Sequence, residues 1–204
     1  MSADLKNSET LKNLMCSFAG ESQARNRYTF AAGLCQKQQF HVLEAVFRFT
    51  ADQEKEHAEI FYNHMKEVTG SSVHVDGGYP VGVTSDVLQL LRYARHNEYE
   101  EFETVYPSFG QTAQAEGFPE IAVSFRQIAK IEQAHGYRFG QFADLLESGK
   151  LFVSDVKCGW MCLNCGHIHQ GTEAPKLCPV CQHQQGYFIR LELAPWGGAA
   201  VLGR

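Results

Sequence analysis

Apolar residues recur at intervals of three and four through most of the first 150 residues, which is the period of helices with one buried face. Ser8, preceded by Asn7, is typical of the residue that caps the start of a helix. Pro107 interrupts the third stretch, where its missing amide donor predicts a kink. The pattern predicts four helices, the longest about 40 Å in length, over residues 8–38, 40–68, 86–116 and 120–147.

The segment between the second and third predicted helices, residues 70–85, is rich in Gly, Ser and Pro and predicts a long connection. Four helices joined in this way form a bundle with one crossover. From Leu151 the helical period is lost, and short strand-like pieces with Cys, Gly and Pro follow. We therefore expect a mainly α chain, with a helical domain over residues 1–150 and a small domain of short strands and loops over 151–204.

Acidic residues occupy the middle of the apolar face of each predicted helix. A buried carboxylate is costly unless it is paired, protonated or bound to a metal. Several carboxylates in one core would repel one another, and two multivalent cations would remove that repulsion. The acids on these faces are Glu21, Glu54, Glu98, Glu101 and Glu132. Four other acids fall off the faces and are expected in solvent: Glu56, Glu59, Glu100 and Glu103.

Two of the acids begin Glu-x-x-His motifs, which end at His57 and His135 and place both side chains on one helix face. In a chain this rich in glutamate and histidine, either motif alone arises readily by chance. The order Glu, Glu-x-x-His, Glu, Glu-x-x-His on four successive helices is that of ferritin-like di-metal sites. The alternative is that these acids lie on solvated faces.

Carboxylates mixed with imidazoles suit iron or manganese, with zinc also possible. Glu54 and Glu132 are placed to bridge two metals, each with its histidine capping one. Glu101 is a surplus carboxylate one turn beyond Glu98, which would let a metal change partners with oxidation state. Two tyrosines on the same faces would hydrogen-bond the carboxylates or relay protons, or would simply pack in the core: Tyr28 and Tyr106.

Two Cys-x-x-Cys motifs lie twelve residues apart in the second domain. Four thiolates at this spacing form a tetrahedral site for zinc or for a single iron, and spacing does not choose between them. About 40 residues cannot bury an adequate core, so the metal would hold this domain together. The four ligands are Cys162, Cys165, Cys178 and Cys181. The remaining cysteines are expected as small apolar residues (Cys16, Cys35) and as a bystander (Cys158).

The charge and the hydropathy of the chain restrict the classes of partner that we expect. The formal charge is -5, without the basic stripe that nucleic acids or anionic membranes require. No apolar run reaches the length of a membrane span, and the N-terminus lacks the order of a signal peptide. We expect a cytoplasmic protein without nucleic-acid or membrane partners.

At the level of motifs the chain resembles the rubrerythrins. The segments that carry the resemblance occur in family order and span both predicted domains: FAGESQARNRY (18–28), TADQEKEHAEIFY (50–62), NEYEEFETVYPSF (97–109), IAKIEQAHGYRF (128–139) and WMCLNCGHIHQGTEAPKLCPVC (160–181).

The resemblance implies a ferritin-like bundle with a di-iron site, followed by a rubredoxin-like domain with one iron on its four cysteines, where zinc can substitute. By motif position it implies that Glu54 and Glu132 are the bridges, and that one iron exchanges Glu101 for His57 on reduction. The full set of di-iron ligands it implies is Glu21, Glu54, His57, Glu98, Glu101, Glu132 and His135.

The activity that the resemblance implies is reduction of hydrogen peroxide, with electrons relayed through the Fe(Cys)4 centre. A separate rubredoxin or flavin-dependent NAD(P)H reductase would supply the electrons. Family members commonly form homodimers in which the Fe(Cys)4 domain of one subunit lies near the di-iron site of the other.

Two other functions remain open from the sequence. One is a ferroxidase that handles or stores iron, and the other is an unrelated oxidase with a structural zinc ribbon. The attached cysteine module favours the peroxidase, because storage needs no electron conduit. The tail, residues 193–204, departs from the family pattern, and its Trp196 and glycines suggest a subunit contact or a loose end.

Overall fold

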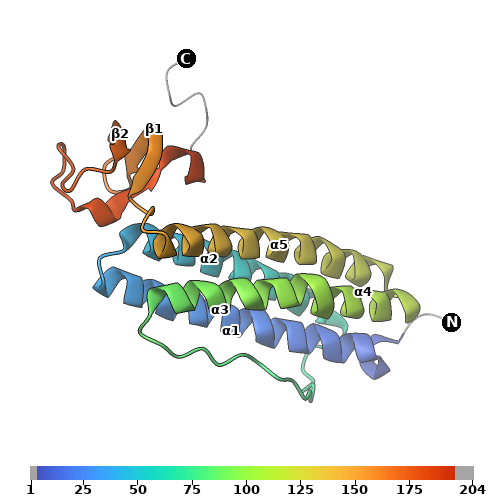
Figure 1. The fold of residues 1–204 in the computed structure, drawn as a ribbon. Coiled ribbons are helices and arrows are strands. Elements are labelled where there is room, and N and C mark those ends of the chain that lie inside the picture. The colour runs from blue at the N-terminus through green and yellow to red at the C-terminus, as the bar shows by residue number, and fades with distance from the viewer. Residues whose placement is uncertain (1–3, 196–204) are drawn as a thin grey trace.

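The computed structural model describes residues 4–195, and it forms a helical bundle with a small sheet domain at one end (Figure 1). The predicted fold class is confirmed: a ferritin-like bundle precedes a small antiparallel domain that carries four cysteines. The helices are α1 (Glu9–Lys37), α2 (His41–His64), α3 (Val87–Glu100), α4 (Tyr106–Ala115) and α5 (Pro119–Glu147).

Local side chains explain where the helices start. Ser8 caps α1 as expected, its hydroxyl oxygen accepting a hydrogen bond from the Leu11 amide at 3.0 Å. Asp86 caps α3 in the same way at the amide of Leu88. The α-helical part of the second helix ends at His64, earlier than predicted, and a short 3-10 turn continues it to residue 68.

The crossover runs along the outside of the bundle, from the end of α2 to the start of α3 (Figure 1). It makes α2 and α3 parallel, whereas α5 runs opposite to both. The two helices that carry the Glu-x-x-His motifs, α2 and α5, are therefore antiparallel neighbours. An approximate two-fold relation between them follows from this arrangement.

A π-helical turn over residues 101–105 separates α3 from α4, just before Pro107. In this turn the Tyr106 amide donates to the Glu101 carbonyl, five residues back. Pro107 has no amide hydrogen to continue the α-helical ladder. The predicted irregularity is thus present, but it takes the form of a wide turn that begins at one of the candidate ligands.

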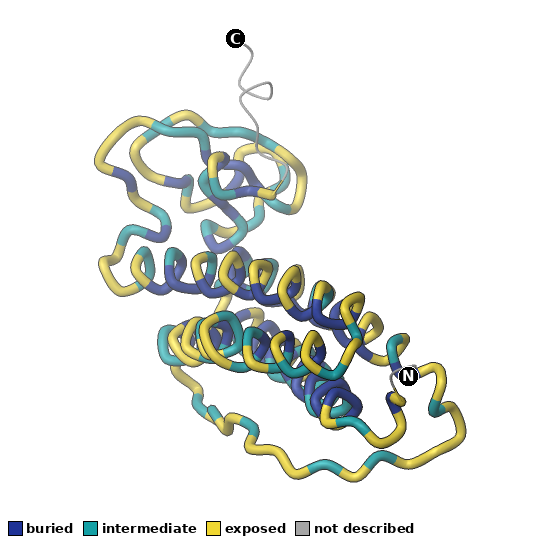
Figure 2. The backbone as a smooth tube through the Cα atoms, turned by 90° about the vertical axis from the view of Figure 1, so that its right-hand side faces the viewer, coloured by how far each residue is buried: buried dark blue, intermediate teal, exposed yellow. Residues whose placement is uncertain are grey.

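Buried apolar residues form two clusters in the bundle, one toward each end. Phe47 and Phe139 belong to the cluster nearer the sheet domain, and Phe61 and Phe125 to the other. Figure 2 shows the buried positions facing inward along the helices. The charged residues predicted for the core lie between the two clusters.

The sheet of the small domain has the strand order β2-β1-β3, and both pairings are antiparallel. Its strands are β1 (Val153–Cys162), β2 (Ile168–Glu173) and β3 (Phe188–Arg190). Trp160 and Phe188 are fully buried in a core that also includes Cys162 and Cys178. The boundary at residue 150 stays a prediction; it falls in the short connection between α5 and β1.

The small domain rests on the turn between α1 and α2. Tyr187 stacks on His41 with ring centroids 3.9 Å apart, and Met161 and Ile189 join the nearer apolar cluster of the bundle. Gly186 approaches the turn so closely that a Cβ there would lie 1.8 Å from the carbonyl oxygen of Gln39. Glycine is therefore required at this contact.

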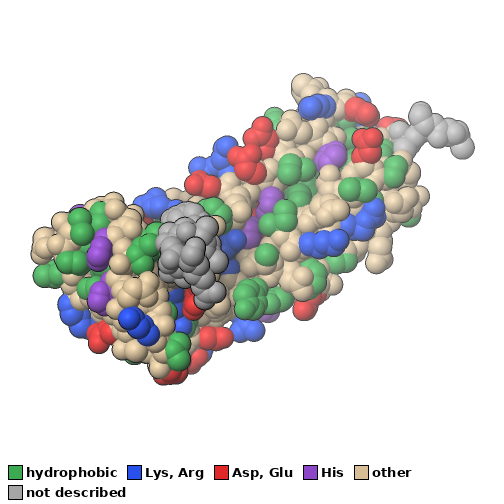
Figure 3. All heavy atoms as spheres, turned by 90° about the horizontal axis from the view of Figure 1, so that it is seen from above, with side chains coloured by type: hydrophobic (Ala, Val, Ile, Leu, Met, Phe, Trp, Pro, Cys, Tyr) green, Lys and Arg blue, Asp and Glu red, His purple; other side chains and the backbone are tan. Residues whose placement is uncertain are grey.

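No helix within residues 4–195 combines the length and apolar character needed to cross a bilayer. Acidic and basic side chains are interspersed over the face seen in Figure 3. Residues 196–204, with Trp196 and most of the tail, lie outside the described residues.

Candidate metal centres

The predicted acids and histidines of the bundle converge on two overlapping groups, and every member is buried. Within each group, the candidate ligand atoms all lie within 4.8 Å of one another. The first group is Glu21, Glu54, His57 and Glu132, and the second is Glu54, Glu98, Glu132 and His135. The solvated-face alternative fails for these residues, whereas the four acids predicted to lie off the faces are exposed.

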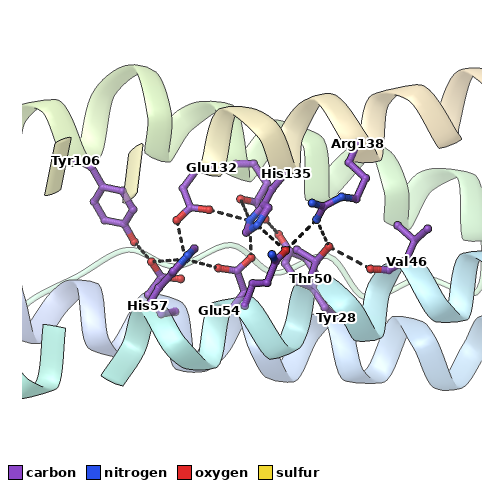
Figure 4. Close-up of polar contacts among 12 residues, drawn as sticks. Tyr28, Val46, Thr50, Glu54, His57, Tyr106, Glu132, His135 and Arg138 are labelled. Atoms are coloured by element: carbon purple, nitrogen blue, oxygen red, sulfur yellow. Dashed lines mark hydrogen bonds and ion pairs between the residues drawn. The ribbon is translucent and has the colours of Figure 1, made fainter. Parts of the chain in front are cut away.

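Glu54 and Glu132 belong to both groups and face both histidines. Nδ1 of His57 lies 3.1 Å from Oε2 of Glu54 and 3.0 Å from Oε1 of Glu132. Nδ1 of His135 lies 2.9 Å from the other oxygen of each carboxylate. Each carboxylate thus presents one oxygen to each side, which is the geometry of a bridge between two metals (Figure 4).

Several of these atoms are buried without a hydrogen bond, although charged partners lie close by. Oε1 of Glu54 and Nδ1 of His135 are 2.9 Å apart, yet neither makes a hydrogen bond. Both oxygens of Glu132 and Oε2 of Glu98 are likewise buried without a hydrogen bond. Buried polar atoms are normally satisfied. Atoms that converge without bonding one another fit ligands that share a common ion.

The two tyrosines donate hydrogen bonds to the outer carboxylates. The Tyr106 hydroxyl donates to Oε1 of Glu21, and the Tyr28 hydroxyl donates to Oε1 of Glu98. Both tyrosines are buried. Burial and the neighbouring carboxylates raise their pKa values well above the usual range, so both hydroxyls keep their protons. Each group of candidate ligands thus has one tyrosine hydrogen-bonded to one of its carboxylates.

Without metal, the carboxylates perturb one another strongly. Burial and repulsion by neighbouring carboxylates raise the pKa of Glu21 well above its ordinary value, and burial and Glu54 raise the pKa of Glu98 to about 8. Burial opposes ionisation of Glu54 too, but its contacts with His135 and His57 prevail and lower its pKa to about 2. The site holds more negative charge than it can leave uncompensated.

Glu101 is the one predicted di-metal ligand that lies outside both groups. It lines a cavity of about 240 Å³ between the bundle and the crossover, with Arg27, Tyr106 and Tyr79. Burial and repulsion by Glu98 raise its pKa, and Arg27 partly offsets this. Tyr106, which lines this cavity together with Glu101, donates its hydrogen bond to Glu21 of the His57 group.

The sequence analysis did not single out two polar residues beside His135, which are Gln53 and Arg138. Oε1 of Gln53 lies 3.1 Å from Nε2 of His135, and the Arg138 guanidinium donates to the same oxygen. Both residues stand directly beside the motifs, since Gln53 precedes Glu54 and Arg138 follows His135 by three. That adjacency was the available signal.

The four cysteines of the small domain form a compact group, with Sγ atoms 3.7 Å apart for Cys162 and Cys181 and 3.6 Å apart for Cys165 and Cys178. The backbone bends around each pair: the amide of Gly166 donates to the carbonyl of Cys162, and the second pair has the equivalent bond. A backbone hydrogen bond lowers the pKa of Cys181 to about 6, which favours the thiolate.

The other cysteines differ in environment. Cys35 is fully buried, and burial raises its pKa to about 12, as expected for an inert apolar residue. Cys16 is only partly buried and lines the same cavity as Glu101. Cys158 lies on β1 outside the four-cysteine group.

Comparison with known proteins gives the same two-part division. The sequence profile of the family described as Rubrerythrin matches residues 12–143, and that of the rubrerythrin rubredoxin-like domain matches residues 160–189. A rubrerythrin of Clostridium perfringens is 45% identical over 90% of this chain and 95% of its own. One of Porphyromonas gingivalis is 42% identical over 92% of each chain.

Solved structures agree on the fold. Fully reduced, all-ferrous nigerythrin superposes with a TM-score of 0.61 at 26% identity, over 93% of this chain and 91% of that one. A bacterioferritin of Desulfovibrio desulfuricans reaches 0.58 over 69% of this chain at 20% identity, which supports the fold alone.

Proposed function

Since this chain belongs to the rubrerythrin family, with its di-iron ferritin-like domain and rubredoxin-like Fe(Cys)4 domain, we propose that it reduces hydrogen peroxide to water. Electrons enter at the Fe(Cys)4 centre from a separate rubredoxin or flavin-dependent NAD(P)H reductase. The observation that carries the proposal is the presence of both metal sites in one chain. A storage ferritin needs no attached electron carrier.

The residues of the bundle fit a two-electron reductase. When bound, the two iron ions supply together the two electrons that cleavage of the O–O bond requires. Glu54 and Glu132 hold the two positions at a fixed separation, because each presents one oxygen to either side. Phe61 and Phe139, from the flanking apolar clusters, keep bulk water away from both ends of the site.

Tyr28 and Tyr106 supply protons within the site. Each phenolic hydroxyl is hydrogen-bonded to a carboxylate that also faces a metal position, Glu98 and Glu21 respectively. The proton is held at the tyrosine oxygen until charge develops on a departing oxygen, when it would pass to that oxygen through the carboxylate, and a proton from solvent would return to the tyrosine. Peroxide reduction consumes two protons for two waters, so a donor on each side matches the stoichiometry.

Electron delivery supports a homodimer. The small domain lies beyond the end of α5, and the 15 residues that follow Glu132, up to Glu147, alone span about 22 Å of helix. A separation of that size is long for electron transfer between the two sites of one chain. We propose that the Fe(Cys)4 centre of one subunit serves the di-iron site of its partner, in a homodimer or a larger homo-oligomer.

An anaerobic single-turnover experiment tests the proposal. The iron-loaded protein is fully reduced, and the thiolate-to-iron absorption is followed after mixing with hydrogen peroxide or, for comparison, with air. We expect rapid reoxidation of the Fe(Cys)4 chromophore by peroxide and much slower reoxidation by air. A chromophore that stays reduced while peroxide oxidises the di-iron pair would contradict the proposed wiring and favour iron handling.

A further inference from the structure

The two Glu-x-x-His motifs are alike in sequence, but the outer nitrogens of their histidines have different neighbours. Nε2 of His135 lies 3.1 Å from Oε1 of Gln53, an amide oxygen that can only accept a hydrogen bond. His135 must therefore carry its proton on Nε2. Its Nδ1, which faces Glu54, Glu98 and Glu132, is therefore the nitrogen that would give up its proton and coordinate when a metal binds.

Arg138 holds the acceptor in place. Its Nη1 donates to Oε1 of Gln53 at 3.2 Å and to the Thr50 hydroxyl at 2.9 Å. Because a guanidinium can only donate, the oxygen of the Gln53 amide is the atom that faces both Arg138 and His135. The Thr50 hydroxyl in turn donates to the Val46 carbonyl at 3.1 Å. The Arg138 guanidinium also lies over the ring of Phe49, 5.1 Å from its centroid. Figure 4 shows the contacts that connect Arg138 to Thr50 and Thr50 to Val46, beside His135.

The same positions around His57 are apolar. By the two-fold relation of α2 and α5, the counterpart of Gln53 is the residue before Glu132, which is Ile131, and the counterpart of Arg138 is Ile60, three residues after His57. Both isoleucines are partly exposed, at 39% and 40%. Between residues 4 and 195, the protein offers the His57 Nε2 no hydrogen bond. Only its Nδ1 is engaged.

We propose that Gln53 and Arg138 are positioning residues that fix the orientation and the protonated nitrogen of His135. No such contact holds the outer nitrogen of His57 within residues 4–195, so His57 is the less constrained histidine of the pair. The inference rests on the proposed ligand roles, but not on the choice of peroxide as substrate. The asymmetry of the pair thus comes from residues next to the motifs.

Anaerobic ferrous titration of the metal-free protein tests this proposal through affinity. Partners that orient a ligating histidine typically contribute about 10- to 100-fold in metal affinity. We expect Gln53→Met and Arg138→Met to weaken one of the two ferrous binding steps to this extent. Arg138→Lys should restore most of the affinity, because an ammonium still donates to the Gln53 oxygen. Ile60→Met and Ile131→Met are the matched controls and should leave both steps unchanged.

A second measurement reports the hydrogen bond itself. In zinc-loaded protein labelled with 15N at histidine, the His135 ring Nε2–H should exchange slowly with solvent, and this signal should be lost in Gln53→Met. Unchanged ferrous affinity together with unchanged ring-proton exchange in Gln53→Met would overturn the inference. If the titration and exchange behave as expected while the wild-type protein fails to reduce peroxide, the proposed function fails and the positioning role stands.

Discussion

The bundle and the cysteine domain use metal in opposite ways. In the bundle, two large apolar clusters lie on either side of the charged site, so most of the hydrophobic core is independent of the metal. In the cysteine domain, Cys162 and Cys178 are themselves members of the small core around Trp160 and Phe188. The first region positions a reactive site at a cost in buried charge, and the second uses its metal in place of a core.

Stability and metal binding are therefore coupled differently in the two regions. Removing metal from the bundle leaves buried carboxylates that repel one another, yet it leaves Phe47, Phe61, Phe125 and Phe139 in place. Removing metal from the cysteine domain removes the link that closes its chain. We therefore expect the two regions to respond differently to the same loss.

The largest expected effect is loss of the cysteine domain alone. Cys165→Ser removes one thiolate, and small metal domains are commonly unfolded without their ion. Both tryptophans of the chain lie in the C-terminal part, so tryptophan emission follows this domain, whereas far-ultraviolet circular dichroism follows the bundle. We expect a red-shifted emission with nearly unchanged helicity. Parallel loss of both signals would show that the domains fold as one unit.

Loss of a candidate ligand in the bundle should weaken metal binding without destabilising the metal-free protein. Glu21→Gln keeps an acceptor for the Tyr106 hydroxyl but removes one carboxylate from the His57 group. We expect ferrous affinity at one position to fall by at least about tenfold. The metal-free variant should be as stable as the wild type or more so, because a buried acid with a raised pKa has been removed. Thermal unfolding of the metal-free proteins measures this, and a lower midpoint for the variant contradicts it.

Contact between the two regions depends on Gly186. Gly186→Ala would place a Cβ 1.8 Å from the Gln39 carbonyl oxygen, so the turn or the small domain has to shift. Overpacking of this kind costs about 1–3 kcal/mol. We expect the Fe(Cys)4 absorption to persist while proteolysis between α5 and β1 accelerates. Gly78→Ala is the control, since a Cβ there meets no atom within 4 Å. Equal proteolysis of the two variants would argue against a tight contact.

Metal-free bundle stability should fall as pH rises. Burial lowers the pKa of His57, but Glu132 and Glu54 outweigh it and raise the pKa to about 9, against about 6.5 in the unfolded chain. This stabilisation is full below pH ~6.5 and is lost as pH rises toward 9. Glu98, raised to about 8, acts in the same direction. We expect a loss on the order of a few kcal/mol between pH 6 and 9, measured by denaturant unfolding, and little change with metal bound.

Helical period explains how much of the site could be predicted from the sequence. Glu21, Glu54, Glu98 and Glu132 are buried as expected, because spacing alone decides which face of a helix points inward. The π-helical turn at Glu101 was not predicted, since it depends on how backbone hydrogen bonds rearrange ahead of Pro107. Contacts between helices are equally absent from the pattern of a single helix.

The contact between Gln53 and His135 depends on the rotation of α2 against α5, which no single-helix pattern contains. The fit of Gly186 against Gln39 is likewise a contact between segments almost 150 residues apart. Sequence patterns therefore predicted which candidate ligands are buried and grouped together better than they predicted the residues that support and join the two regions.

Loss of a tyrosine hydrogen bond should have the smallest effect of these changes, and it tests which region limits turnover. Tyr28→Phe removes the hydrogen bond to Glu98, and Tyr106→Phe removes the one to Glu21, without changing the ligands. We expect either variant to slow reoxidation of the reduced di-iron pair in a single turnover by about tenfold. If electron entry through the cysteine domain is slower than chemistry in the bundle, steady-state peroxide reduction will hardly change. An equal slowing in both measurements would place the limiting step in the bundle, and no slowing in either would remove the tyrosines from the proton path.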